Sequence, residues 1–149
     1  MGALPWYYFT PYQPDIYKVF LDLRRREFNA GRYYPAVKML QFPVLASSPS
    51  PGAKHHSIEE AIEAAGPNGT RSILDIQGVS LKGPASRGTV APLSTESLLE
   101  LYGTKLPTRE MVEQNMDFFA ELERGHGVFL VVFKQGQPDE ILFAGYSYD

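Results

Sequence analysis

Cysteine is absent from this chain of 149 residues. Its absence excludes disulfide bonds, thiolate metal sites and a cysteine nucleophile, and it fits a reducing compartment. Positive charge is also scarce, because 14 lysines and arginines against 17 aspartates and glutamates leave a formal net charge of −3. Domains that bind nucleic acid through its phosphates are usually clearly basic. Nucleic acid is therefore not an expected partner.

Long apolar runs are missing too. The first ten residues lack the basic segment and extended apolar stretch of a secretory signal, and no run reaches the length that crosses a membrane. These features predict a cytoplasmic protein with no membrane partner. The chain also lacks a Walker loop, a dinucleotide fingerprint, a nucleophile elbow and a recognised metal-ligand spacing. No cofactor and no metal site is predicted, and whether the chain is an enzyme stays open.

The composition that remains is that of a folded domain. Apolar residues make up 44% of the chain and charged residues 21%, far from the low hydrophobicity and high charge of disordered segments. A length of 149 residues is common for one domain with one core, and the chain contains no internal repeat and no interdomain linker. We predict a single α+β domain that spans residues 1–149.

Apolar residues at helical spacing, together with capping residues at the ends of these segments, predict four helices. They are expected at residues 14–30, 57–65, 94–102 and 108–124. Residues 47–54 are rich in serine and proline, which predicts a surface loop.

Runs rich in aromatic and β-branched residues predict strands at 5–10, 37–45, 72–76, 128–133 and 141–144. The last two form a predicted hairpin. Neither of them alternates polar with apolar residues, so both faces are expected to be covered, with the hairpin central in the sheet or against a second subunit. Because the elements lack a regular βαβ alternation, we predict a mostly antiparallel sheet of four to five strands.

The first quarter of the chain is the main candidate for a binding surface. The chain has nine tyrosines and one tryptophan, and many of them lie in this quarter. These residues are favoured at interfaces because they supply a large contact area with few torsions to freeze. The predicted binding residues are Trp6, Tyr7, Tyr8, Tyr12, Arg32, Tyr33 and Tyr34. Aromatic packing in the core, with hydroxyls at its rim, is the alternative interpretation.

The candidate catalytic residue is His126, which lies between Gly125 and Gly127 where a predicted helix passes into a strand. An imidazole titrates near neutral pH and can act as a general base, and the glycines would let a ligand approach the backbone. The alternative is a capping glycine followed by an exposed histidine.

Three functions follow from these candidates. The leading hypothesis is a small protein-interaction or regulatory module of the inhibitor kind, whose partner is another protein or a second copy. The alternatives are a small hydrolase or transferase that uses His126 with a carboxylate or with Ser94, and a small-ligand sensor with a pocket between helices and sheet. An exposed aromatic patch favours the first. A cleft in which His126 meets Asp117, Glu123 or Ser94 favours the enzyme.

Overall fold

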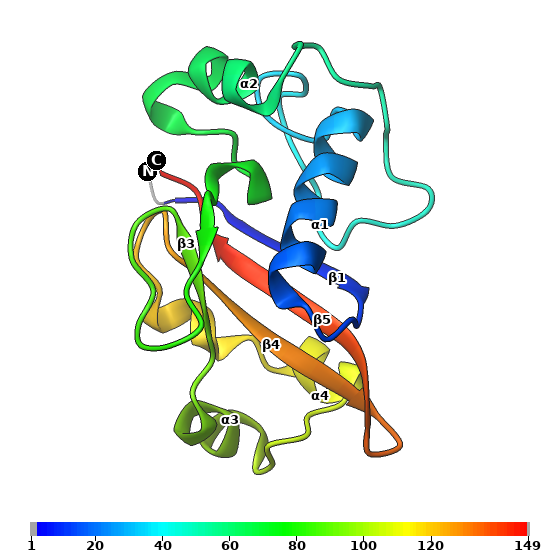
Figure 1. The fold of residues 1–149 in the computed structure, drawn as a ribbon, viewed down its shortest axis with the longest axis vertical. Helices are drawn as coiled ribbons and strands as arrows, with labels where there is room; N and C mark the ends of the chain where they lie inside the picture. Colours follow the sequence, from blue (N-terminus) through cyan, green and yellow to red (C-terminus); the bar gives the residue numbers. More distant parts are fainter. Residues whose placement is uncertain (1–2, 149) are drawn as a thin grey trace.

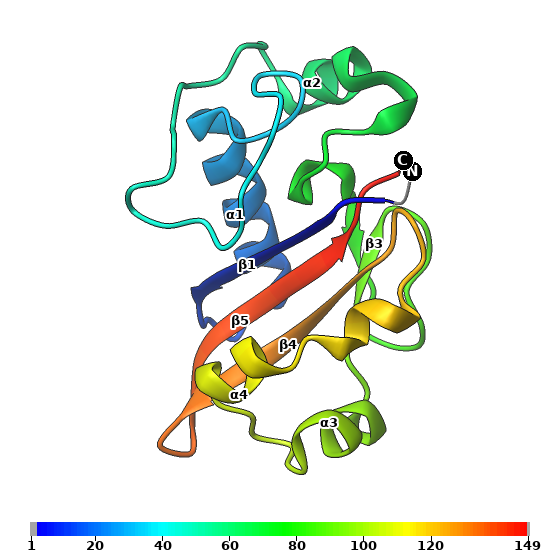
Figure 2. The ribbon, with the colours of Figure 1, turned by 180° about the vertical axis from the view of Figure 1, so that it is seen from behind.

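The computed structural model describes residues 3–148 and contains helices and one five-stranded sheet (Figures 1 and 2). The strands are β1 (Pro5–Pro11), β2 (Gly78–Val79), β3 (Thr89–Pro92), β4 (Gly127–Lys134) and β5 (Gln137–Tyr146). The helices are α1 (Ile16–Ala30), α2 (Ile58–Ala65), α3 (Thr95–Tyr102) and α4 (Arg109–Gln114), with 3₁₀ turns η1 (Gly66–Asn68), η2 (Ile73–Asp75) and η3 (Asp117–Glu121). No helix in this part of the chain is long and apolar enough to span a membrane.

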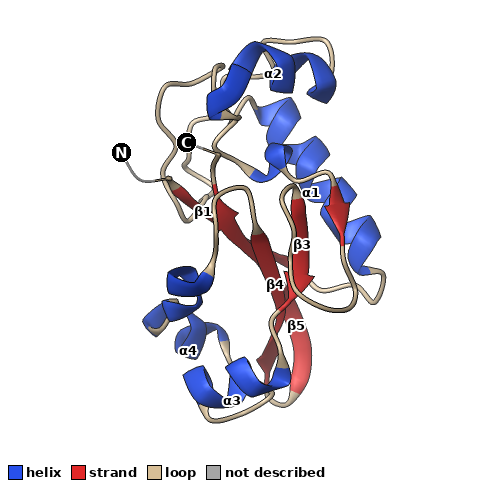
Figure 3. Ribbon diagram, turned by 90° about the vertical axis from the view of Figure 1, so that its left-hand side faces the viewer, coloured by secondary structure: helices blue, strands red, loops and turns tan. Residues whose placement is uncertain are grey.

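Helices cover both faces of the sheet. Figure 3 shows α1 on one side and α4 on the other. On the α1 side, Phe20 packs in one core cluster with Phe129 and Phe143 of the hairpin. On the other side, a second cluster joins Leu130 and Leu142 to residues of α3, α4 and η3. The prediction that both faces of the C-terminal hairpin are covered is therefore confirmed.

The sheet is mixed, so the prediction of a mostly antiparallel sheet is wrong. The strand order is β1-β5-β4-β3-β2. β5 runs antiparallel to both β1 and β4, whereas β3 runs parallel to β4 and to β2. The parallel pair arises because the chain from β3 to β4 crosses one face of the sheet through α3, α4 and η3. In this order the hairpin strands β5 and β4 take the second and third of five positions, beside β1, so each of them has a strand neighbour on both sides.

The predicted helix ends follow the local capping signals. Ser57 accepts a hydrogen bond from the backbone N–H of Glu60, and Ser94 accepts one from Ser97. Gly31 ends α1 with a φ of 75°, a left-handed conformation that glycine adopts at no steric cost. These signals depend on residues within one helical turn, which is why the sequence alone reveals them.

The predicted helix over residues 108–124 is divided in two. α4 ends at Gln114 with Asn115 as its C-cap, and the separate turn η3 begins at Asp117. The side chain of Asn115 donates to the carbonyl of Leu101 at 3.0 Å and accepts from the backbone N–H of Asp117 at 3.0 Å. These bonds replace the helical hydrogen bonds and turn the chain.

Two predicted strands are absent. Residues 37–45 form bends and irregular backbone, because no neighbouring strand supplies a hydrogen-bonded ladder for them. The segment at 72–76 is the 3₁₀ turn η2, in which the Ser72 hydroxyl accepts from the backbone N–H of Leu74 at 3.2 Å. Conversely, β3 was not predicted, because a strand of four residues is too short for its apolar pattern to indicate one.

Limited proteolysis is expected to cleave the chain first between residues 45 and 51. Residues 47–54 contain no helix or strand, and most of their side chains are exposed. The backbone N–H of Gly52 is tied to the carbonyl of Ala30 at 2.9 Å, so the preceding residues are the more accessible ones. Mass spectrometry of early subtilisin digests locates the cut. First cleavage within 127–146, the hairpin, would contradict this assignment.

Candidate functional site

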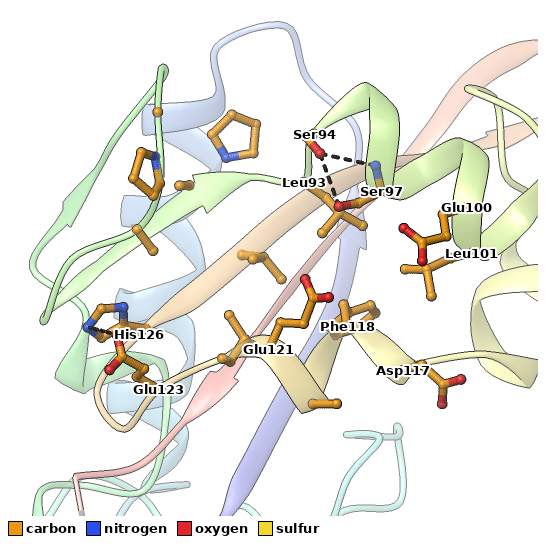
Figure 4. Close-up of a pocket in the computed structure, with 18 of the residues that line it drawn as sticks. Leu93, Ser94, Ser97, Glu100, Leu101, Asp117, Phe118, Glu121, Glu123 and His126 are labelled. Carbon is orange, nitrogen blue, oxygen red and sulfur yellow. Dashed lines mark hydrogen bonds and ion pairs between the residues drawn. The ribbon is translucent and has the colours of Figure 1, made fainter.

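A pocket of about 890 Å³ lies between the sheet and the helical layer that contains α3 and η3 (Figure 4). β3 contributes Ala91 and Pro92 to its wall, and β4 contributes Val128. The loop at residues 81–85 closes one end. Its volume is within the range of small-molecule sites, and it lies where helix and sheet layers meet, a common position for such sites.

The wall of the pocket is mainly apolar. Phe118 and Val128 belong to the buried cluster on this face of the sheet, and Leu93, Leu101 and Leu122 pack against that cluster while still lining the pocket. A ligand with an apolar body would therefore displace water from hydrocarbon surface that already exists in the fold. The free-energy gain is roughly 25 cal/mol for each Å² of apolar surface removed from water.

Two hydroxyls lie at the start of α3. The Ser94 side chain caps the helix by accepting from the backbone N–H of Ser97 at 3.1 Å, and its hydroxyl donates to the Ser97 hydroxyl at 3.0 Å. Ser94 is therefore fully engaged in the cap and is poorly placed to act as a nucleophile. The Ser97 hydroxyl accepts the bond from Ser94 and keeps its own hydrogen for another acceptor.

The charges around the pocket are mostly negative. The ionisable side chains that line it are Lys82, Glu100, Asp117, Glu121, Glu123 and His126. Figure 4 shows the carboxylates of Glu100 and Glu121 directed into the space between α3 and η3, whereas Asp117 points away from it. The lining thus contains four acidic residues against one lysine and one histidine, and the two carboxylates that point into this space, those of Glu100 and Glu121, favour a cationic group on a ligand.

His126 is at the other end of the same pocket. Its Nε2 atom is 4.0 Å from the nearer carboxylate oxygen of Glu123, and its side chain is 19% exposed. That separation is an ionic contact and too long for a hydrogen bond. No hydrogen bond to the His126 ring occurs within residues 3–148, so no second side chain orients the imidazole. Figure 4 places Ser94 well away from this ring.

The glycines on either side of His126 have packing roles. A Cβ on Gly125 would overlap the Tyr148 ring, and its φ of 75° also favours glycine. A Cβ on Gly127 would lie 2.7 Å from Val90 and 2.9 Å from the carbonyl oxygen of Ala144. Close packing of Tyr148 and of the sheet explains both glycines, so they are no evidence for a ligand near the His126 backbone.

Three of the seven predicted binding residues are in the core. Trp6 and Tyr33 are 0% exposed and Tyr8 is 2% exposed. The Tyr33 hydroxyl lies 2.7 Å from His55 Nδ1 and also accepts from the backbone N–H of Lys54. Burial raises the pKa of the Tyr8 phenol well above its ordinary value. These three side chains pack in the core, so the seven residues do not form one exposed surface.

Arg32 is also occupied within the protein. Its guanidinium makes two hydrogen bonds of 2.8 Å to the carboxylate of Glu27, which is 0% exposed. The hydrogen bonds that Arg32 donates to Glu27 raise the pKa of Arg32, because they favour its charged form. Arg32 therefore stabilises the end of α1 and is not placed to grip an anionic partner.

The remaining candidates, Tyr7, Tyr12 and Tyr34, are partly exposed. Tyr12 packs against the core cluster on the α1 side. Tyr7 and Tyr34 line a second, smaller cavity of about 340 Å³ beside the start of β1. Of the seven residues, only these two are brought to the same cavity.

Comparisons with protein-family models, with curated proteins and with solved structures gave no match to this chain. Within residues 3–148, no group of three or more histidine, aspartate or glutamate side chains is placed to hold a metal ion.

Sequence reasoning identified His126, Ser94, Asp117 and Glu123 as possible neighbours, and all four line the larger pocket. It missed Ser97, Glu100 and Glu121. Glu100 and Glu121 have the appearance of solvated helix positions in the sequence. Only the return of the chain from β3 to β4 brings them to the same space.

Proposed function

We propose that this protein binds a small molecule that carries a cationic amine on an apolar body. The binding site is the pocket between β3, β4, α3 and η3. The observation that carries the proposal is the combination of an apolar wall with carboxylates at its mouth in a cavity of about 890 Å³. It corresponds to the ligand-sensor hypothesis among the three that the sequence suggested.

The two parts of the site have different roles. Leu93, Leu101 and Phe118 supply apolar contact, which provides most of the affinity. Glu100 and Glu121 are exposed, so their attraction for an amine is screened by water and contributes at most about 1 kcal/mol each. Their main effect is to select amines over carboxylates, and the free hydrogen of Ser97 adds a donor for an acceptor atom of the ligand.

Titration of the ¹⁵N-labelled protein with phenethylamine and tryptamine tests the proposal. We expect saturable shifts of amides in α3, η3 and β4, with a dissociation constant of about 1 mM, as ~0.4 kcal/mol per heavy atom predicts. The matching carboxylates, phenylpropionate and indolepropionate, should bind several-fold more weakly. Ala120→Trp should fill the pocket, and Glu121→Gln should reduce the preference for amines.

The controls are Ala64→Trp and Glu63→Gln, which make the same changes on the exposed surface of α2. Equal binding of amines and carboxylates would overturn the charge argument. The absence of any saturable shift in the pocket at about 5 mM ligand would overturn the proposal as a whole.

A second candidate function is acid–base catalysis in the same pocket, favoured by the contact of 4.0 Å between His126 and Glu123. The imidazole would take a proton from a bound substrate, and Glu123 would stabilise the imidazolium. The same titrations test this role. Product signals that form with the wild-type protein and not with His126→Gln would favour catalysis, and unchanged ligands would leave binding as the function.

A further inference from the structure

The second cavity, here called the β1 groove, is a separate feature from the pocket. Its volume is about 340 Å³, enough for one large side chain and too small for a folded segment. The lining residues are Leu4, Pro5, Tyr7, Tyr34, Val37, Lys38, Met39, Leu40, Phe42 and Arg71. Met39 is 82% exposed and Leu4 is 45% exposed, so apolar surface is open to solvent around it.

The groove adjoins an open edge of the sheet, because β1 has a strand neighbour on one side only. The backbone N–H of Ser147 donates to the carbonyl of Leu4, and the backbone N–H of Tyr12 donates to the carbonyl of Asp139. In an antiparallel ladder the residues that bond to the partner alternate, so even-numbered residues of β1 face β5. The N–H groups of Tyr7 and Phe9 therefore point outward, and neither has a hydrogen-bond partner within residues 3–148.

The open edge is short. Pro5 and Pro11 stand at the two ends of β1, and proline has no N–H to offer. Proline at the ends of an edge strand hinders the addition of a long strand from another molecule. A partner strand could use only the groups between these prolines, which limits it to a few residues.

The charge around the groove is positive. Besides its two tyrosines, the ionisable residues that line the groove are Lys38 and Arg71, and none of the carboxylates of residues 3–148 lines it. Arg71 lies over the ring of Tyr34 at 4.6 Å, which fixes this cation beside the apolar surface. Lys38 is exposed and forms no ion pair within the described chain. A negatively charged group next to an apolar one is therefore the complementary ligand.

We propose that the β1 groove binds a short extended peptide segment of another protein, in which a large apolar residue is followed two positions later by an acidic residue, so that both side chains lie on the same face of the added strand. The apolar side chain fills the groove, the peptide backbone bonds to the free N–H of Tyr7, and the carboxylate lies near Lys38 and Arg71. This mode adds a short strand to a sheet edge and takes its specificity from one side-chain cavity. The site is independent of the small-molecule pocket.

NMR titration of the ¹⁵N-labelled full chain tests the inference with three capped pentapeptides, acetyl-Thr-X-Val-Asp-Thr-amide, where X is Phe, Leu or Trp. At least one should cause saturable shifts centred on the amides of Tyr7 and Met39. Serine at X should weaken binding by more than about tenfold, because the apolar contact is lost. Lysine in place of the aspartate should weaken it by about fivefold.

Met39→Asp should weaken binding by at least about fivefold, since it places a negative charge beside the bound carboxylate. Its matched control is Leu106→Asp, which changes another exposed apolar residue that lines neither cavity. Because both positions are exposed, both variants should keep the melting temperature of the parent.

The inference is overturned if none of the three peptides binds at about 2 mM, or if the lysine peptide binds as well as the aspartate peptide. Shifts confined to the pocket near Glu121 would also overturn it. Equal binding by octanoate would indicate an anionic amphiphile in place of a peptide. Concentration-dependent broadening without peptide would show that a second copy occupies the groove. If amines do not bind in the pocket between the sheet and α3, the proposed function fails, but the test of the β1 groove is unaffected.

Discussion

Gly145→Ala is expected to lower the free energy of unfolding by about 3 kcal/mol, at the upper end of the usual cost of overpacking. A Cβ at this position would lie 2.5 Å from Cζ2 of Trp6 and 2.7 Å from the carbonyl oxygen of His126. Neither neighbour can yield. Trp6 is 0% exposed within the core, and the His126 carbonyl accepts the backbone N–H of Tyr146. The new methyl group would push β4, β5 and the indole apart.

Gly145 is sensitive to substitution because it stands in a row of paired residues that crosses three strands of the sheet. Trp6 pairs with Gly145, and Gly145 pairs with Gly127 on the next strand. The missing side chains leave the space that the Trp6 indole occupies, since a Cβ on Gly127 would also lie 3.3 Å from this ring. The largest aromatic side chain thus packs on bare backbone, which explains why the chain needs two glycines there.

Urea unfolding of Gly145→Ala beside Gly78→Ala provides the measurement. Gly78 is also in a strand, but nothing lies within 4 Å of its Cβ position and its φ is not positive. Gly78→Ala should therefore change the free energy of unfolding by less than about 0.5 kcal/mol. Equal stability of the two variants would show that Trp6 can move away from Gly145.

These packing relations explain which parts of the fold the sequence predicts. Helix caps such as Ser57 and Ser94 depend on residues three positions away, and they were predicted correctly. The covered faces of the hairpin were also predicted, because uninterrupted apolar strands need partners on both sides. The parallel strands β3 and β4 are separated in the sequence by a crossover of more than thirty residues, and local patterns do not predict that they pair.

The aromatic residues show the same difference between signals that are local in the sequence and contacts that are distant in it. Their abundance predicted a surface, but a buried tyrosine needs only one partner for its hydroxyl, and the partner can be distant in sequence. Tyr33 finds His55, and the Tyr8 hydroxyl accepts from the backbone N–H of Ile73 at 3.4 Å. Composition alone therefore could not separate core tyrosines from Tyr7 and Tyr34, which line the β1 groove.

Arg32→Ala is expected to lower the free energy of unfolding by about 3–5 kcal/mol, the cost of removing one partner from a buried ion pair. The Glu27 carboxylate is 0% exposed, and Arg32 supplies two of its hydrogen bonds. The third bond, at 3.0 Å, comes from Arg26, whose side chain is 45% exposed. Without Arg32 the carboxylate keeps only this one partner, and a buried charge with so few hydrogen bonds destabilises the end of α1.

Thermal and urea unfolding of Arg32→Ala and Arg25→Ala separate this structural role from binding. Arg25 is an exposed arginine in the same helix with no ion pair in the described chain, so its loss should cost less than about 0.5 kcal/mol. The double variant Glu27→Met with Arg32→Met should recover most of the loss, because well-packed apolar residues often replace a buried ion pair without penalty. If Arg32→Ala unfolds like the parent and instead weakens binding of an acidic partner, the surface role predicted from the sequence is correct, and the pairing with Glu27 is dispensable for the fold.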